Sequence, residues 1–119
     1  MKPLNDVEKI IINRINYQFD HFLEFTPMVK INRLYWRELR YHGMTPLEFI
    51  QRLDRESKIR IIITRKMTTL IIPIAVAKAI EPIELAQIEF DYGTDRGSAS
   101  IPQIIREVHT RLANKGKEK

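Results

Sequence analysis

Apolar residues near the start of the chain recur every three or four positions, which is the spacing of an amphipathic helix. The pattern predicts a helix over residues 6–23. Asn5 or Asp6 can cap its start, because these side chains accept hydrogen bonds from unpaired backbone N–H groups. Pro27 limits its end, since the residue before a proline is disfavoured in the helical conformation. The expected apolar stripe consists of Val7, Ile11, Ile15, Phe19 and Phe22.

Two further helices are predicted over residues 28–41 and 45–56, with Gly43 between them. Glycine tolerates the left-handed backbone conformation in which many helices end. The second of these helices starts with Thr45 as N-cap, Pro46 at the first helical position and Glu48 at the third, which is a capping box with a proline start. The expected buried residues are Ile31, Leu34, Tyr35 and Leu39 in one helix and Phe49, Ile50 and Leu53 in the other.

β-Branched residues then dominate the chain and predict two strands, over residues 59–64 and 67–72. Arg65 and Lys66 lie between the strands, at the tip of a predicted β-hairpin. Neither residue suits a two-residue primed turn, so we expect a longer loop that extends from Thr64 to Thr68.

The last third of the chain contains a third strand and a fourth helix in this interpretation. Residues 74–81 fit either a short helix or more strand, whereas the alternation within residues 85–92 predicts a strand with one buried face. A turn over residues 93–97 leads to an amphipathic helix from Ser100, followed after Leu112 by a basic, frayed tail. The predicted fold is therefore α+β, with residues 1–119 forming one domain.

The order of helix, helix, glycine-containing turn, helix and β-hairpin over residues 6–73 resembles that of winged helix-turn-helix domains. Such domains place the helix after the turn in the major groove of DNA, and their hairpin reaches toward the backbone or the minor groove. The resemblance implies that this chain would contact DNA with the residues Gln51, Arg52, Arg55, Arg65 and Lys66.

Three acidic residues do not fit the resemblance to winged helix-turn-helix domains. Glu48, Asp54 and Glu56 place negative charge on the helix that is expected to approach phosphates. The strongest basic feature lies instead on the preceding helix. There, cations at spacings of three, four and three residues share one face beside Trp36; they are Lys30, Arg33, Arg37 and Arg40.

The charge distribution supports a polyanionic partner. The chain has a net charge of +5, and residues 30–66 hold ten Lys and Arg against four Asp and Glu. Because stacked cations repel each other unless a partner neutralises them, the basic helix face is a candidate contact for the phosphate backbone. The alternative is a solvated face that Glu38 and other acids compensate, with Trp36 half-buried.

The leading hypothesis is therefore a cytoplasmic regulator or accessory factor that binds nucleic acid, most simply double-stranded DNA. The alternative is an interaction or assembly module whose basic face docks an acidic protein. Residues 83–114 form a possible homodimerisation element, or else they close the protein's own core.

Catalysis, cofactors and metals are not expected. His21, His42 and His109 lack the spacing of a metal site or a catalytic pair. Strand alternation and a turn explain the acidic residues at 89, 91 and 95 more simply than a divalent-metal nuclease site does. The chain has no cysteine, no secretory pattern at its start and no apolar run long enough to span a membrane, so we expect a soluble protein without membrane contact.

Overall fold

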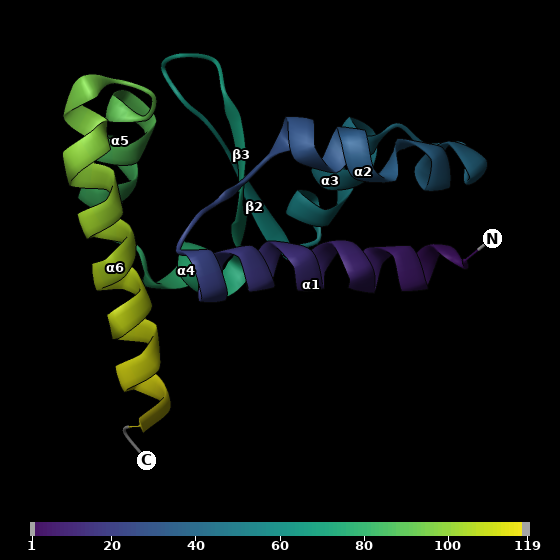
Figure 1. The fold of residues 1–119 in the computed structure, drawn as a ribbon. Coiled ribbons are helices and arrows are strands. Elements are labelled where there is room, and N and C mark those ends of the chain that lie inside the picture. Colours follow the sequence, from purple (N-terminus) through teal and green to yellow (C-terminus); the bar gives the residue numbers. More distant parts are fainter. Residues whose placement is uncertain (1, 118–119) are drawn as a thin grey trace.

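The computed structural model describes residues 2–117, and within them it contains six helices and a three-stranded antiparallel sheet (Figure 1). This arrangement confirms the predicted α+β class. The helices are α1 (Leu4–Phe22), α2 (Met28–Tyr41), α3 (Pro46–Arg55), α4 (Ile74–Ala79), α5 (Pro82–Asp91) and α6 (Asp95–Lys117). The strands are β1 (Thr26–Pro27), β2 (Ile59–Ile63) and β3 (Thr69–Pro73).

The central strand of the sheet is β3, which pairs with β1 on one side and β2 on the other. Thr26 and Ile61 both lie opposite Ile71. Ile71 is buried in one hydrophobic cluster, whereas its neighbours Leu70 and Ile72 are buried in another. Because successive side chains of a strand point to opposite faces, the sheet separates two cores.

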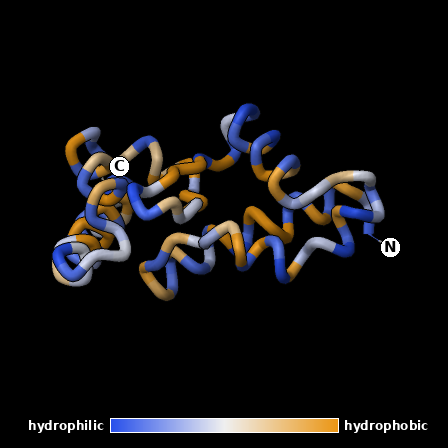
Figure 2. Tube along the Cα trace, turned by 90° about the horizontal axis from the view of Figure 1, so that it is seen from above, coloured by the Kyte–Doolittle hydropathy of each residue, from blue (hydrophilic) through white to orange (hydrophobic). Residues whose placement is uncertain are grey.

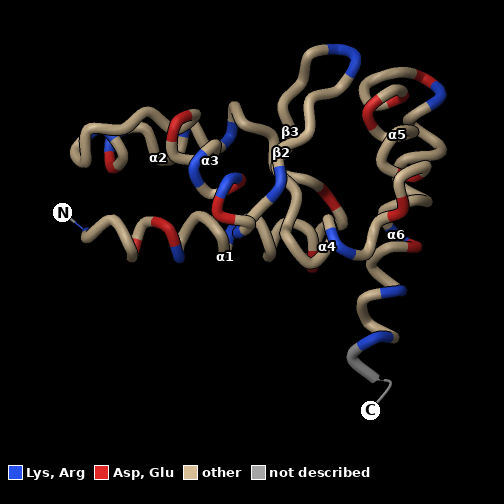
Figure 3. Tube along the Cα trace, turned by 180° about the vertical axis from the view of Figure 1, so that it is seen from behind, with Lys and Arg blue, Asp and Glu red and all other residues tan. Residues whose placement is uncertain are grey.

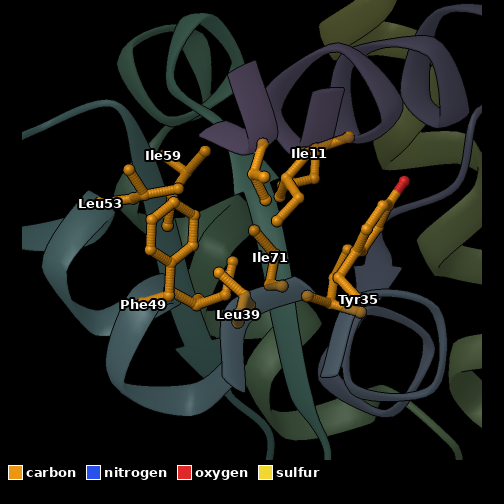
Figure 4. Close-up of a cluster of buried hydrophobic side chains, with 11 residues drawn as sticks. Ile11, Tyr35, Leu39, Phe49, Leu53, Ile59 and Ile71 are labelled. Carbon is orange, nitrogen blue, oxygen red and sulfur yellow. The ribbon is translucent and has the colours of Figure 1, made fainter. Parts of the chain in front are cut away.

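The first core lies between α1, α2, α3 and one face of the sheet. Figure 4 shows Phe49, Leu39 and Ile11 converging with Ile71 from these elements. The phenol oxygen of Tyr35, at the edge of the cluster, accepts a 2.7 Å hydrogen bond from Arg14 Nε. This core holds the helix-turn-helix segment α2–α3 against the sheet.

The second core lies on the opposite face of the sheet and is closed by α4, α5 and α6. The predicted apolar stripe of the last helix is buried there, which supports the expectation that this helix closes the protein's own core. In Figure 2, hydrophobic and hydrophilic positions alternate along the helical tubes, as expected for helices with one buried face. The buried residues contributed by the C-terminal helices are Val76, Ile88, Ile101, Ile104, Ile105 and Val108.

The prediction of a strand over residues 85–92 is wrong, because the chain forms the helix α5 from Pro82 to Asp91. Glu81 and Glu84 form a reciprocal capping box at its start, with a 2.9 Å hydrogen bond from Glu81 N to Glu84 Oε1. Pro82 occupies the first turn, where its missing N–H costs nothing. The local alternation is therefore coincidental, and Leu85 and Ile88 face the core at helical spacing.

The ends of two predicted helices also differ from the structure. α1 begins at Leu4 after Pro3 and has no side-chain cap, so neither Asn5 nor Asp6 is the N-cap. α6 begins at Asp95 rather than Ser100, and it continues to Lys117, past the predicted end. The helical conformation therefore covers residues 113–117 of the segment that we expected to be frayed, and residues 118–119 lie outside the described residues.

Two predicted core residues are exposed, and one strand was not predicted. Phe22 is 57% exposed and Leu34 is 41% exposed, at the edges of the buried stripes of α1 and α2. β1 consists of only Thr26 and Pro27, which is too short to produce a strand pattern in the sequence.

The left-handed residue at Gly43, the Thr45 N-cap and the loop over residues 64–68 are confirmed, whereas the turn predicted over residues 93–97 is wrong beyond Thr94, because α6 begins at Asp95. Of the predicted capping box, the structure has the hydrogen bond to the Thr45 side chain only. Gly43 has a φ of 73°, and Thr45 Oγ1 accepts a 3.1 Å hydrogen bond from Glu48 N. The hairpin loop extends from Thr64 to Thr68, joined by a 2.9 Å hydrogen bond from Thr64 N to Thr68 O. The ambiguous segment after Pro73 forms the short helix α4.

Candidate nucleic-acid interface

The basic residues of α2 lie opposite its buried face, which consists of Ile31, Tyr35 and Leu39. Arg33, Arg37 and Arg40 are exposed, and none of them forms an ion pair with any residue between positions 2 and 117. We call these three residues the arginine stripe. No carboxylate of the described residues therefore lies within ion-pair distance of the stripe.

Lys30 differs from the arginine stripe because it is half-buried and bound to α1. Its Nζ donates a 3.2 Å hydrogen bond to Gln18 Oε1. Trp36 is 42% exposed, and the Arg37 guanidinium lies 5.2 Å from the centre of its ring. Glu38, which could have compensated the stripe, forms no ion pair within residues 2–117, and its buried Oε2 has no hydrogen-bond partner there.

The outward face of α3 presents Gln51 and Arg55 to solvent. Arg52 is half-buried between two groups of its own helix. Its Nε donates a 3.2 Å hydrogen bond to Glu56, and its guanidinium lies 5.8 Å from the centre of the Phe49 ring. Of the two predicted base-contacting arginines, Arg52 therefore has an ion-pair partner among residues 2–117 and Arg55 has none.

Of the three acidic residues predicted on this helix, Glu56 is the one that forms ion pairs among residues 2–117. Glu56 is bound by Lys58 and Arg52, and the hydrogen bond from Lys58 is the main reason why the pKa of Glu56 is lowered. Asp54 accepts a hydrogen bond of 3.4 Å from Ile61 N in the adjacent strand. Glu48 alone of the three acids remains exposed without a side-chain hydrogen bond or ion pair within residues 2–117. Asp54 and Glu48 therefore keep their negative charge without an ion pair among residues 2–117.

The hairpin tip contacts α5. Arg65 N donates a 2.7 Å hydrogen bond to Glu89 O, and the Arg65 guanidinium lies 4.3 Å from the centre of the Phe90 ring. Lys66 is exposed beside it and approaches Gly93 with its aliphatic stem. Both cations remain accessible to solvent while the tip is held in place.

The nine predicted contact residues lie on α2, on α3 and at the hairpin tip. The helices α2 and α3 pack on each other, whereas the tip packs on α5. Figures 1 and 3 show these three parts on the same side of α1, and Figure 3 marks basic positions at the hairpin tip. α5 and α6 lie at the other end of the molecule from the N-terminus. The predicted residues of α2 and α3 therefore lie on adjacent helices, while Arg65 and Lys66 lie beside α5.

The acidic residues considered for a nuclease site are not arranged as one. Asp91 is buried at the end of α5, and Asp95 is exposed at the start of α6. Residues 2–117 contain no group of three His, Cys, Asp or Glu side chains that could hold a metal ion. Among the same residues, no helix has the length and apolar character needed to cross a bilayer.

Comparisons with protein-family models, with curated proteins and with solved structures found no match to this chain.

Proposed function

We propose that this protein binds double-stranded DNA in the manner of a winged-helix regulator or accessory factor. The observation that carries the proposal is the arginine stripe, which presents three guanidinium groups on one helix face without an ion-pair partner in residues 2–117. Like charges three or four residues apart destabilise a helix by about 0.2–0.5 kcal/mol per pair. A phosphate backbone would remove this repulsion and release counterions.

The arrangement of α2, α3 and the hairpin gives each predicted contact a role. Arg33, Arg37 and Arg40 would bind backbone phosphates, assisted by Lys30 at the edge of the stripe. The hairpin tip would add Arg65 and Lys66 to the backbone contacts. A protein working in this way needs access to DNA, so a cytoplasmic location is part of the proposal.

Base contacts would come from the outward face of α3. Gln51 and Arg55 extend into solvent and have the hydrogen-bonding groups that recognise adenine and guanine edges. Arg52 would have to exchange Glu56 for a base or a phosphate, and its contribution is therefore smaller than its position in the sequence suggests.

The arginine stripe is tested by replacing Arg33, Arg37 and Arg40 together with glutamine. If each arginine neutralises one phosphate, the slope of log K against log salt loses about 0.9 per residue, or about 2.7 in all. Fluorescence anisotropy of a labelled duplex at several salt concentrations measures the slope. Circular dichroism checks that the variant remains folded, as expected for three exposed side chains.

A matched control replaces Lys9, Arg106 and Lys115 with glutamine. These exposed cations lie on α1 and α6, and the control removes the same net charge as the stripe variant. We expect its slope to stay within about 1 of the unmodified protein. Equal losses of slope in the two variants would mean that the stripe is not the DNA contact and that only overall charge matters.

A further inference from the structure

Trp36 is a large aromatic side chain on the solvent side of α2. It is 42% exposed, whereas its neighbour in the sequence, Tyr35, is only 6% exposed. Single exposed apolar residues are normal in soluble proteins. An exposed aromatic ring beside clustered cations, however, is typical of surfaces on which unpaired nucleic-acid bases stack. The groups around Trp36 therefore indicate what it can bind.

The three residues of the arginine stripe are all neighbours of Trp36. Arg33 precedes it by three positions and Arg40 follows it by four, so they lie one turn before and one turn after it on the helix surface. The Arg37 guanidinium lies 5.2 Å from the centre of the indole ring. The cations and the exposed ring therefore belong to the same part of the surface of α2.

We propose that the arginine stripe and Trp36 bind DNA in which an unpaired base lies next to a paired segment, as in a duplex with a short gap in one strand. This inference rests on the proposed function and names the form of DNA that the same site prefers. The arginines would bind phosphates, and the indole ring would stack on the unpaired base. Arg37 has no ion pair among residues 2–117, so it is free to exchange the indole ring for a phosphate and expose the ring to the base.

A fully paired duplex does not present such a base. Both faces of each base are covered by its neighbours in the stack, and separating two stacked bases costs free energy. In a gap the faces of the bases are already accessible, so stacking on Trp36 adds to the affinity. Stacking of one base on an aromatic side chain corresponds to about 5- to 150-fold in affinity. We expect a preference of this size for the gapped duplex over the paired one.

The fluorescence of Trp36 reports on this stacking directly, because Trp36 is the single tryptophan of the chain. The unmodified protein is titrated at low salt with a duplex and with the same duplex that has a short gap in one strand. At saturation, the gapped duplex should quench the fluorescence more strongly than the paired duplex does. Anisotropy of a label on each DNA measures the two affinities independently. Equal affinities, or equal fluorescence at saturation, would overturn the inference.

Trp36→Ala separates the effect of stacking from that of charge. This variant should bind the gapped duplex no more tightly than the paired one, whereas Trp36→Phe keeps an aromatic ring and should retain most of the preference. Tyr17→Ala is the matched control, because Tyr17 is 53% exposed but lies on α1, so its loss should leave the preference unchanged. Circular dichroism checks that each variant is folded. A preference that survives in folded Trp36→Ala contradicts the assignment.

This inference and the proposed function fail in different ways. Salt-dependent binding to the paired duplex without a preference for the gap rejects the role of Trp36 and keeps the proposed function. If neither DNA binds at low salt, both proposals are rejected, and an acidic protein becomes the favoured partner of the arginine stripe.

Discussion

Gly97→Ala is expected to destabilise the protein even though Gly97 lies within helix α6. A Cβ added at Gly97 would overlap with the carbonyl oxygen of Asp91, would lie 2.8 Å from its carbonyl carbon and would touch Ile101 Cδ1 at 3.0 Å. Thr94 fixes this close approach, because its N–H and its hydroxyl both donate to Asp91 O while its Oγ1 accepts from Gly97 N. The junction between α5 and α6 therefore requires glycine.

Two opposing effects determine how much Gly97→Ala lowers the free energy of unfolding. Overpacking against backbone atoms costs about 1–3 kcal/mol. Replacing glycine by alanine in a helix recovers at most about 1 kcal/mol, and less in the first turns, where Gly97 lies. The net loss should be about 1–2 kcal/mol, which lowers the Tm of a domain of this size by about 5 °C or more.

Differential scanning calorimetry of Gly97→Ala beside the unmodified protein tests this reasoning. Gly43→Ala is an informative comparison, because Gly43 has open space around its Cα and a φ of 73°. Its cost of about 1 kcal/mol would come from backbone conformation alone. An unchanged or increased Tm for Gly97→Ala would refute the close packing of α5 on α6.

Three other predictions concern local stability. Thr45→Ala removes the hydrogen-bond acceptor at the start of α3, so the free energy of unfolding measured in urea should fall by about 1 kcal/mol. Phe49→Ala leaves a cavity in the first core and should cost about 3–5 kcal/mol in the same assay. The hydrogen bonds from Arg111 lower the pKa of Glu84, so their stabilisation is complete above the ordinary pKa of 4.5 and is lost as the pH falls through the folded value. Glu84→Gln should therefore flatten the decrease of Tm with acidification below about pH 4.5, and an unaltered pH dependence would contradict this assignment.

Local signals predicted α3 because its start contains several of them together. Thr45 and Pro46 specify the cap and the first turn of the helix through neighbouring backbone atoms, and Glu48 adds an acidic residue to the first turn. The start of α5 has a related pattern in Glu81, Pro82 and Glu84. That pattern could have predicted α5, but a glutamate at the N-cap is a weaker signal than threonine, and the alternation of the following residues favoured a strand.

Contacts between distant parts of the chain explain the remaining differences. Spacing alone predicted the arginine stripe, because it depends only on the helical period of α2. It could not predict that Arg65 would stack on Phe90, 25 residues later, or that Lys58 would bind Glu8, 50 residues earlier. β1 is a strand only because β3 supplies its hydrogen-bonding partner.

The central claim, that this protein binds DNA, is tested most directly by titrating the unmodified chain against a labelled duplex, first at low and then at physiological salt. Binding through the arginine stripe predicts that log K decreases against log salt with a slope of about −2.7 or steeper, with the hairpin cations adding to it. An absence of binding at low salt, or an affinity that salt leaves unchanged, would contradict the claim.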